Sequence, residues 1–394
     1  MALTRNVWKI LSFVFILTFV LSAASMVHAD TTLAISVTIT VGQNPVAVAY
    51  DSGKGEIFSV NNGDGTVSVI SDSTDAVVAT VTVGQNPLGV AYDSGKGEVF
   101  VSNYGSDTVS VISDDTNSIV ATVTLDNSPG ALAYDSGRGE IFVVDGTTVS
   151  VISDSNNAIV ATVSSVGNYP SGIAYDSGKG EIFVSNNDAT GAGASVAVIS
   201  DSNNKVVATV NLAEGDAPEG LAYDSGKGEI FVAIYNAASI VIISDKTNSV
   251  VATVADAPNG GYGGDPDSIT YDSAKSVIFV SAGHTYALSD SNNAVVAEIP
   301  QESNAAAYDS SNGEIFIVNG ANNASPVYVV SDTSITSSGS NPNVSASETA
   351  TSSPTSTPSV PEFSASTVIL VLAAVAITFC AVVLTARNPH SKRL

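Results

Sequence analysis

Between residues 33 and 332 the chain alternates short apolar segments with polar turns. The apolar segments are rich in Val, Ile and Ala, and many alternate apolar and polar side chains, as Thr108–Ser113 does. Alternation of this kind with β-branched residues is typical of half-buried β-strands. The turns contain Gly, Asp, Asn and Ser, which tolerate the positive φ angles of tight connections. The pattern therefore predicts an all-β body.

The strand pattern repeats in phase along the chain. In the second repeat we expect four strands, at residues 88–92, 99–103, 108–113 and 118–125. A repeat of about 40 residues made of four strands predicts a β-propeller. The tripeptide Tyr-Asp-Ser marks each repeat, and it begins at Tyr50, Tyr92, Tyr134, Tyr175, Tyr223, Tyr271 and Tyr308, with spacings of 42, 42, 41, 48, 48 and 37 residues.

The two ends of the repeat array complement each other. The seventh repeat has three expected strands and ends near Asp332, whereas residues 33–41 match the fourth strand of the other repeats. Docking 33–41 beside 327–331 would complete the last sheet and close a ring, which removes the unpaired first and last edges. An open solenoid would need caps at its ends instead. The sequence therefore predicts a closed seven-bladed propeller of four-stranded blades over residues 30–332.

Both termini carry long apolar segments. Residues 1–29 have a basic start, an apolar run and small residues before Asp30, as a secretory signal peptide does. Residues 367–386 are about 20 apolar or small residues and predict one transmembrane helix. The basic tail after that segment predicts a cytoplasmic C-terminus and an extracellular propeller. The protein is thus expected at the outer face of the cell membrane or in the cell wall.

A polar stretch separates the propeller from the C-terminal segment. Residues 333–360 are rich in Ser, Thr, Pro and Asn, and this composition is typical of a flexible stalk. Asn343 and Asn323 fit the acceptor pattern for N-glycosylation, although Pro326 follows the second closely. Residues 361–394 then contain Pro361-Glu362-Phe363, the apolar segment and the basic tail.

The repeat resembles the YVTN-type β-propeller repeat of archaeal and bacterial surface proteins. The resemblance rests on Val101-Ser102-Asn103-Tyr104, on the Thr-Val-Ser-Val-Ile-Ser-Asp that follows, and on the Gly-Gln-Asn-Pro lead-in, and it covers residues 33–332. It implies the propeller fold and a cell-surface location, but no reaction. Residues 361–394 resemble the PEF-type sorting signals of archaeal surface proteins, which implies cleavage by a sortase-like enzyme. A permanent anchor is the alternative.

Charge and cysteine content narrow the function classes. The net charge is −25, with 13 Lys and Arg against 38 Asp and Glu. Such a surface repels nucleic acid, so no nucleic-acid partner is expected. The single cysteine, Cys380, lies in the expected membrane segment, so the propeller is expected to have neither a disulfide nor a thiolate metal site. His284 is the one histidine between the signal peptide and the membrane segment, and no nucleophile motif surrounds it, so we expect a protein without catalytic activity.

Loop lengths locate the expected binding face. The turns between the first and second strands, and between the third and fourth, keep one length in every repeat, whereas the other two connections vary. In a four-stranded blade the two variable connections emerge on one face, and loops carry function on a fixed scaffold. The longest are 186–195 and 255–267. The candidate ligand-binding residues on this face are Tyr104, Asp107, Tyr169, Asn187, Asp188, Tyr235, Asn236, Tyr262, Asp265 and His284.

These residues offer carbonyl, carboxylate and aromatic groups, which suit a surface glycan or a protein partner. The sequence predicts a non-catalytic interaction or adhesion module. One alternative is a structural cell-envelope component without a discrete ligand. A second is a calcium-assisted extracellular hydrolase, because carboxylates could hold calcium. No cofactor is expected, apart from calcium that these carboxylates could bind weakly. The acidic residues of Asp-Ser-Gly-Lys-Gly-Glu are better explained by turn capping and a local ion pair.

Overall fold

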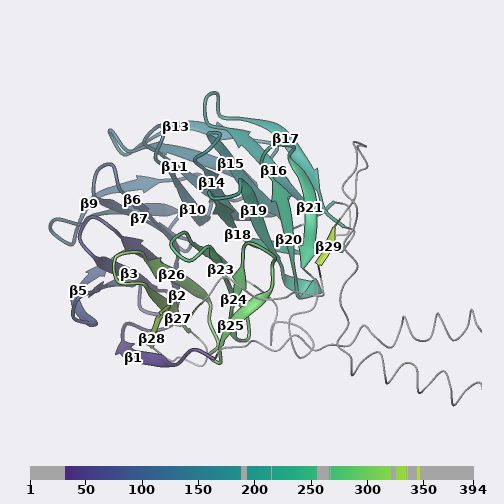
Figure 1. Cartoon of the computed structure of the whole chain (residues 1–394). Coiled ribbons are helices and arrows are strands. Elements are labelled where there is room, and N and C mark those ends of the chain that lie inside the picture. Colours follow the sequence, from purple (N-terminus) through teal and green to yellow (C-terminus); the bar gives the residue numbers. More distant parts are fainter. Residues whose placement is uncertain are drawn as a thin grey trace, which may run out of the picture. The chain divides into compact units, whose positions relative to one another are not determined.

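The computed structural model describes residues 32–187, 193–213, 215–254, 266, 268–320, 325–333, 335 and 344–346. These residues form seven antiparallel sheets, which we call blades 1 to 7 in chain order (Figure 1). Each blade runs from an inner strand through a second and a third strand to an outer strand. The predicted all-β propeller with seven four-stranded blades is confirmed.

The strands follow the repeat boundaries closely. Blade 1 contains β2 (Pro45–Asp51), β3 (Glu56–Asn61), β4 (Thr66–Ser71) and β5 (Ala76–Thr82). Blade 2 contains β6 (Pro87–Asp93), β7 (Glu98–Asn103), β8 (Thr108–Ser113) and β9 (Ser118–Thr124). Blade 3 contains β10 (Pro129–Asp135), β11 (Glu140–Asp145), β12 (Thr148–Ser153) and β13 (Ala158–Val163). Blade 4 contains β14 (Pro170–Asp176), β15 (Glu181–Asn186), β16 (Ser195–Ser200) and β17 (Lys205–Asn211).

The later blades are less uniform. Blade 5 contains β18 (Pro218–Asp224), β19 (Glu229–Ile234), β20 (Ser239–Ser244) and β21 (Ser249–Val254), with the 3₁₀ helix η1 (Tyr235–Ala237) between β19 and β20. Blade 6 contains β22 (Ser268–Asp272), β23 (Val277–Ser281), β24 (Thr285–Ser289) and β25 (Val295–Ile299). Blade 7 contains β26 (Ala305–Asp309), β27 (Glu314–Val318), β28 (Pro326–Ser331) and β1 (Ile35–Thr40). A short strand, β29 (Val344–Ala346), pairs with β21.

The N-terminal strand closes the ring, as its sequence predicts. β1 pairs antiparallel with β28, with Ile39 opposite Val327 and Thr38 opposite Tyr328. The inner strands contact one another in a cycle, because β2 contacts both β6 and β26. The pairing of β1 with β28 joins the first and last repeats through backbone hydrogen bonds. Blades 7 and 1 also share an apolar cluster, as every other neighbouring pair of blades does.

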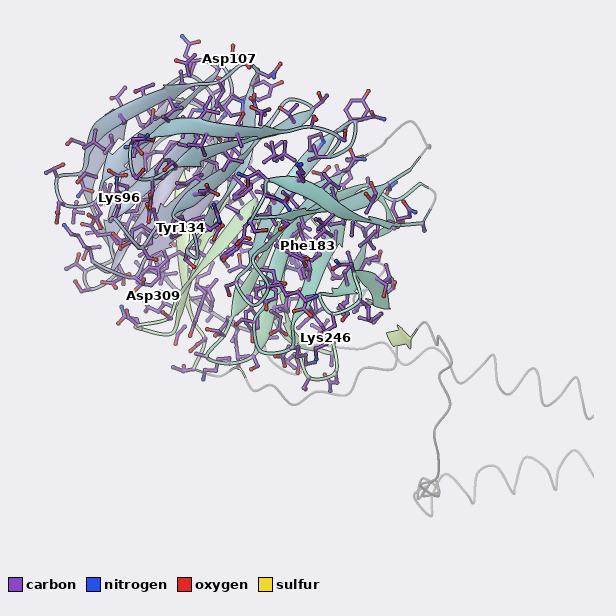
Figure 2. The ribbon with its side chains drawn as sticks, turned by 90° about the horizontal axis from the view of Figure 1, so that it is seen from above. Lys96, Asp107, Tyr134, Phe183, Lys246 and Asp309 are labelled. Carbon is purple, nitrogen blue, oxygen red and sulfur yellow. The ribbon has the colours of Figure 1, made fainter. Side chains whose placement is uncertain are left out.

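The core lies between neighbouring blades. Each second strand places a phenylalanine there with no exposed surface, and Figure 2 shows Phe183 among the strands of the ring. Phe183 packs with Val198 of its own blade and with Leu221 and Ile230 of blade 5. Because each apolar cluster joins two blades, a blade cannot bury its faces alone and depends on its neighbours.

The constant turns have the conformations that their residues predict. Gly97 has a φ of 66°, and a Cβ at this position would lie 2.5 Å from a carboxylate oxygen of Asp114. The Asp93 carboxylate accepts hydrogen bonds from the backbone N–H groups of Gly95 and Lys96, at 2.8 and 3.2 Å. The predicted turn capping is therefore correct. In blade 6 Ser276 takes the glycine position with a φ of 56°, and the strands of that blade are five residues long.

The segments outside the propeller fall mainly outside the described residues. The expected signal peptide 1–29, the segment 361–394 and the glycosylation candidates Asn323 and Asn343 all lie there. No helix in the part of the chain that the structure describes is long and apolar enough to cross a bilayer. Within the expected stalk 333–360, residues 344–346 form β29, which the composition of the stalk did not predict.

Candidate functional site

A cavity of about 970 Å³ occupies the centre of the ring. All seven inner strands contribute to its wall, with small and apolar residues such as Gly89, Gly172 and Leu132. Residues from both types of variable loop also line it, among them Asn127 before β10 and Gly146 after β11. The predicted meeting of these loops on one face is therefore correct, and the cavity lies next to that face.

Three of the predicted site residues line this cavity. Tyr104 and Tyr169 are 50% and 55% exposed, so they lie where the cavity opens to solvent. The third is Asp107, whose carboxylate accepts a hydrogen bond from the Ser128 hydroxyl at 3.0 Å. Figure 2 shows Asp107 at the margin of the molecule, away from the buried Phe183. The opening thus combines two aromatic faces with a carboxylate.

The backbone at both tyrosines is held in place. The Tyr169 N–H donates to the side-chain oxygen of Asn186 at 2.8 Å, and its carbonyl accepts from the Asn187 N–H at 2.8 Å. The Tyr104 N–H donates to the Asn86 carbonyl at 3.1 Å. Because the backbone is fixed, the two rings stay near the opening before any ligand arrives, which lowers the entropic cost of binding.

Glu219 on β18 is a cavity residue that the sequence reasoning missed. Its carboxylate accepts hydrogen bonds from the Ser171 hydroxyl and from the Asn187 side-chain amide, the latter at 2.7 Å. Of the described residues that line the cavity, Asp107 and Glu219 are the charged ones, and both are negative. The lining therefore favours neutral or cationic groups and repels anions.

A signal for Glu219 was present in the repeat. It follows the proline that begins the inner strand, and the corresponding residues in blades 1 to 4 are Val46, Leu88, Gly130 and Ser171. The corresponding residues in blades 6 and 7 are Asp267 and Asn304, so the position is small or apolar in blades 1 to 4 and polar in blades 5 to 7. This change along the chain is the signal that the repeat offers. Only the fold shows that this position faces the centre of the ring.

The other described candidates are not among the residues that line the cavity. Asn187 donates a hydrogen bond to the Glu219 carboxylate, so it contacts a residue of the cavity wall without lining the cavity itself. Tyr235, which is 44% exposed, and Asn236 form η1, where the Asn236 side-chain amide donates to the Gly215 carbonyl. His284 shares a 2.6 Å hydrogen bond with the Glu298 carboxylate on the outer strand β25. This contact directs the His284 ring toward the outer part of blade 6.

Asp188, Tyr262 and Asp265, which were the remaining predicted residues, lie outside the described residues. Within the described ranges, no group of three or more His, Cys, Asp or Glu side chains is arranged to hold a metal ion. The calcium alternative therefore has no cluster to support it in the described part of the chain.

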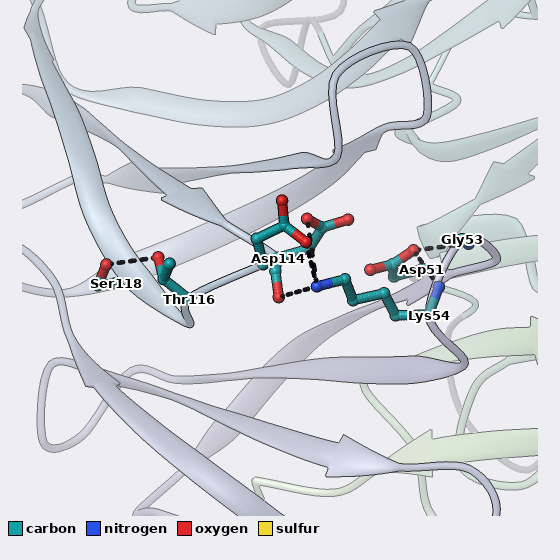
Figure 3. Close-up of polar contacts among 7 residues, drawn as sticks. Asp51, Gly53, Lys54, Asp114, Thr116 and Ser118 are labelled. Carbon is teal, nitrogen blue, oxygen red and sulfur yellow. Dashed lines mark hydrogen bonds and ion pairs between the residues drawn. The ribbon is translucent and has the colours of Figure 1, made fainter.

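The constant turns lie at the other ends of the strands and join neighbouring blades. Lys54 of blade 1 reaches blade 2, where its ammonium group lies 2.6 Å from the Asp115 carboxylate and donates to the Asp114 carbonyl (Figure 3). Lys96, Lys179 and Lys227 donate to backbone carbonyls of the next blade in the same way. The predicted local ion pair is therefore wrong for these lysines, because their long side chains extend across the gap between blades. It is correct for Arg138, which lies 3.3 Å from Glu140.

Carboxylates crowd together beneath these turns. Burial raises the pKa of Asp114, and the neighbouring Asp51 of blade 1 raises it further. The same arrangement raises the pKa of Asp154 next to Asp93 and that of Asp201 next to Asp135. Burial also raises the pKa of Tyr50 and Tyr271 to about 12. The face of the ring that carries the constant turns therefore concentrates carboxyl groups, and these groups bind protons more tightly in the folded state than in the unfolded chain.

This crowding predicts that the propeller becomes more stable as the pH is lowered from 7 toward the ordinary pKa range of aspartate. A carboxyl group whose folded-state pKa is raised stabilises the fold in its protonated form, and this contribution is lost as the pH rises through the raised pKa. We expect the melting temperature of Asp114→Asn to exceed that of the wild type at pH 7 by about 2–4 °C, because about 1 kcal/mol corresponds to that shift in a large domain. Thermal unfolding followed by circular dichroism tests this.

A matched control is Asp126→Asn, because Asp126 is exposed and the variant makes the same change in net charge. We expect its melting temperature to stay within about 1 °C of the wild type. An equal rise in both variants would assign the effect to net charge and contradict the role of the paired carboxylates.

Comparison with known proteins supports the fold. No family model matches the chain, and a search of curated proteins finds no match either. Among solved structures, hydrazine synthase from Kuenenia stuttgartiensis is similar, with a TM-score of 0.68 over 74% of this chain and 96% of that chain. The sequences are 14% identical. A likeness at this identity shows a shared fold and carries no information on activity.

Proposed function

We propose that the protein is a non-catalytic interaction module that binds neutral glycans at the opening of its central cavity. The observation that carries this proposal is the cavity of about 970 Å³ with Tyr104 and Tyr169 half exposed at its opening. Concave sites with aromatic side chains and a few polar groups are the usual form of small-ligand sites. The tyrosine rings offer apolar faces to a sugar ring, and Asp107 offers a hydrogen-bond acceptor to its hydroxyls.

The charge of the lining supports neutral rather than acidic glycans. Asp107 and Glu219 would repel a uronic or sialic acid, and the net charge of −25 adds to the repulsion. A basic peptide is compatible with the same charges. The tyrosines favour the glycan, because the apolar C–H face of a sugar ring can pack on an aromatic ring without requiring a charge.

We further propose that the module acts at the cell surface and belongs to the YVTN-type repeat proteins. Residues 1–29 would direct secretion, and residues 367–386 would hold the protein in the membrane with the propeller outside. Mass spectrometry of the mature C-terminus separates a permanent anchor from PEF-type processing. A peptide containing Arg387 to Leu394 would contradict the processing.

The glycan proposal predicts that Tyr104→Ala and Tyr169→Ala each weaken binding about tenfold, which corresponds to about 1.4 kcal/mol per lost contact. Each change removes an aromatic face at the opening of the cavity. A glycan array probed with the full chain identifies the ligand, and calorimetry with that ligand then measures the dissociation constants of both variants.

Tyr235→Ala provides the matched control, because Tyr235 is similarly exposed but is not one of the residues lining the cavity. We expect its affinity to equal that of the wild type. Equal losses in all three variants would contradict the cavity as the site. Failure to bind any glycan would favour the structural envelope component, and turnover of a substrate that EDTA abolishes would favour the calcium-assisted hydrolase.

A further inference from the structure

The outer strands of blades 1 to 4 form an apolar rim. Each strand exposes a valine at the same position, to between 51% and 53%, at Val78, Val120, Val160 and Val207. This residue sits at a β-bulge, where the register between third and outer strand shifts by one. Bulges interrupt edge pairing in natural sheets, so the first half of each outer strand is protected in this way.

The second half of each outer strand pairs with the third strand without a bulge, and its other edge has no neighbouring strand in the described residues. It reads Ala-Thr-Val in all four blades, at 79–81, 121–123, 161–163 and 208–210. Within the described ranges these outer strands pair only with the third strand of their own blade. Each therefore presents a row of unpaired backbone N–H and C=O groups, which can form hydrogen bonds with another extended segment.

Blades 5 and 6 show what covers such an edge. In blade 6 the corresponding Val296 is only 6% exposed, because Leu33 and Ile335 pack in the same cluster. The Leu33 N–H donates to the Glu298 carbonyl on the outer strand at 2.8 Å. Segments from just before and just after the propeller thus cover this blade, and both come from the chain itself.

In blade 5 the outer strand gains a complete partner. β29 pairs antiparallel with β21, with Val344 opposite Val254, Ser345 opposite Thr253 and Ala346 opposite Ala252 (Figure 1). The pairing begins just past the bulge, on the same Ala-Thr-Val sequence. Val251, at the bulge position, is half-buried here, whereas its equivalents in blades 1 to 4 are exposed.

We propose that the segment around Val344–Ala346 of one copy exchanges its place on β21 of its own blade 5 for an outer strand of blades 1 to 4 in a neighbouring copy, where it adds as a fifth strand. The acceptor sequence on which β29 docks occurs four more times in the chain, while the described residues of each chain contain one such donor segment. Adding a strand to an open edge is a common mode of protein recognition, in which backbone hydrogen bonds supply affinity. Because one copy offers four acceptor strands, it could take donor segments from several neighbouring copies.

The donor side is tested with Ser345→Pro in the full chain, kept in a mild detergent because of its apolar C-terminal segment. Proline removes the N–H group of the central residue of β29 and does not fit a paired strand. We expect the self-association constant from analytical ultracentrifugation to fall about tenfold. Ser347→Pro, which lies just beyond β29, is the matched control and should associate as the wild type does.

The acceptor side is tested with Val78→Lys, Val120→Lys, Val160→Lys and Val207→Lys combined. All four side chains are half exposed, so the fold should tolerate the change, and lysines on an edge oppose strand addition. We expect the same loss of self-association, while the corresponding four Val→Thr changes should preserve it. A synthetic peptide of residues 340–350 should compete with self-association of the wild type.

A full chain that stays monomeric at every concentration reached would overturn the proposal. A second contradicting result is loss of self-association in the combined Val→Lys variant but not in Ser345→Pro. The outer strands would then bind a segment other than β29. These outcomes are independent of glycan binding, since neither set of variants touches the central cavity.

Discussion

Replacing Ile39 by alanine is expected to lower the free energy of unfolding by about 2–5 kcal/mol, which is the usual cost of truncating a buried isoleucine. Ile39 is 5% exposed and packs with Phe316 and Val318 of blade 7. It lies on β1, the strand that joins the first and last repeats into a ring. Truncating Ile39 should therefore weaken the docking of β1 that closes the ring, as well as the apolar cluster between blades 7 and 1. Unfolding in guanidinium chloride, followed by far-UV circular dichroism, measures the free energy of unfolding.

Ile35→Ala is the matched control for this prediction. Ile35 lies on the same strand and also pairs with β28, but it is 37% exposed. The substitution changes β-propensity in the same way and should cost less than about 1 kcal/mol. If both variants lost equal stability, the effect would come from strand propensity rather than from the buried contact that closes the ring.

Phe183→Ala is expected to cost about 3–5 kcal/mol, because a fully buried phenylalanine leaves a cavity that its neighbours fill only in part. Phe183 has no exposed surface and packs against Leu221 and Ile230 of blade 5. The change removes contacts across a blade boundary, so we expect a lower midpoint of denaturation. Measuring the denaturant slope together with the midpoint shows whether the seven blades still unfold as one unit.

Val207→Ala in the same blade provides the comparison for Phe183. Val207 is 51% exposed on the outer strand, and its truncation should change stability by less than about 0.5 kcal/mol. A Phe183→Ala protein as stable as Val207→Ala would show that the contacts between blades do not hold the ring together. The single row of buried phenylalanines would then need another explanation.

The two faces of the ring differ in how constant their connections are. On the face of the constant turns, Lys54, Lys96, Lys179 and Lys227 link blades 1, 2, 4 and 5 each to the blade that follows, and the turn lengths stay constant. On the loop face, Tyr104 and Tyr169 lie at the opening of the cavity on connections whose length varies. A rigid scaffold that presents variable loops is the arrangement in which binding sites are usually found.

The sequence by itself determined the number of blades, the position of the strands and the strand that closes the ring. These features follow from local signals: a strict repeat, alternating apolar residues, and turn residues such as Gly97 whose conformations are set within a few residues. The missing outer strand of the seventh repeat also pointed to 33–41, because complementary ends can be recognised from the repeat alone.

Only the tertiary structure decided which loop residues meet. Tyr104 and Tyr169 come from different blades and meet at one cavity, while Glu219 reaches its wall from blade 5. His284 was an equally good candidate in the sequence, yet it binds Glu298 on an outer strand. The pairing of Val344–Ala346 with β21 was also not predictable. The physical reason is that these contacts join residues far apart in the chain, and their distances are fixed only once the blades close into a ring.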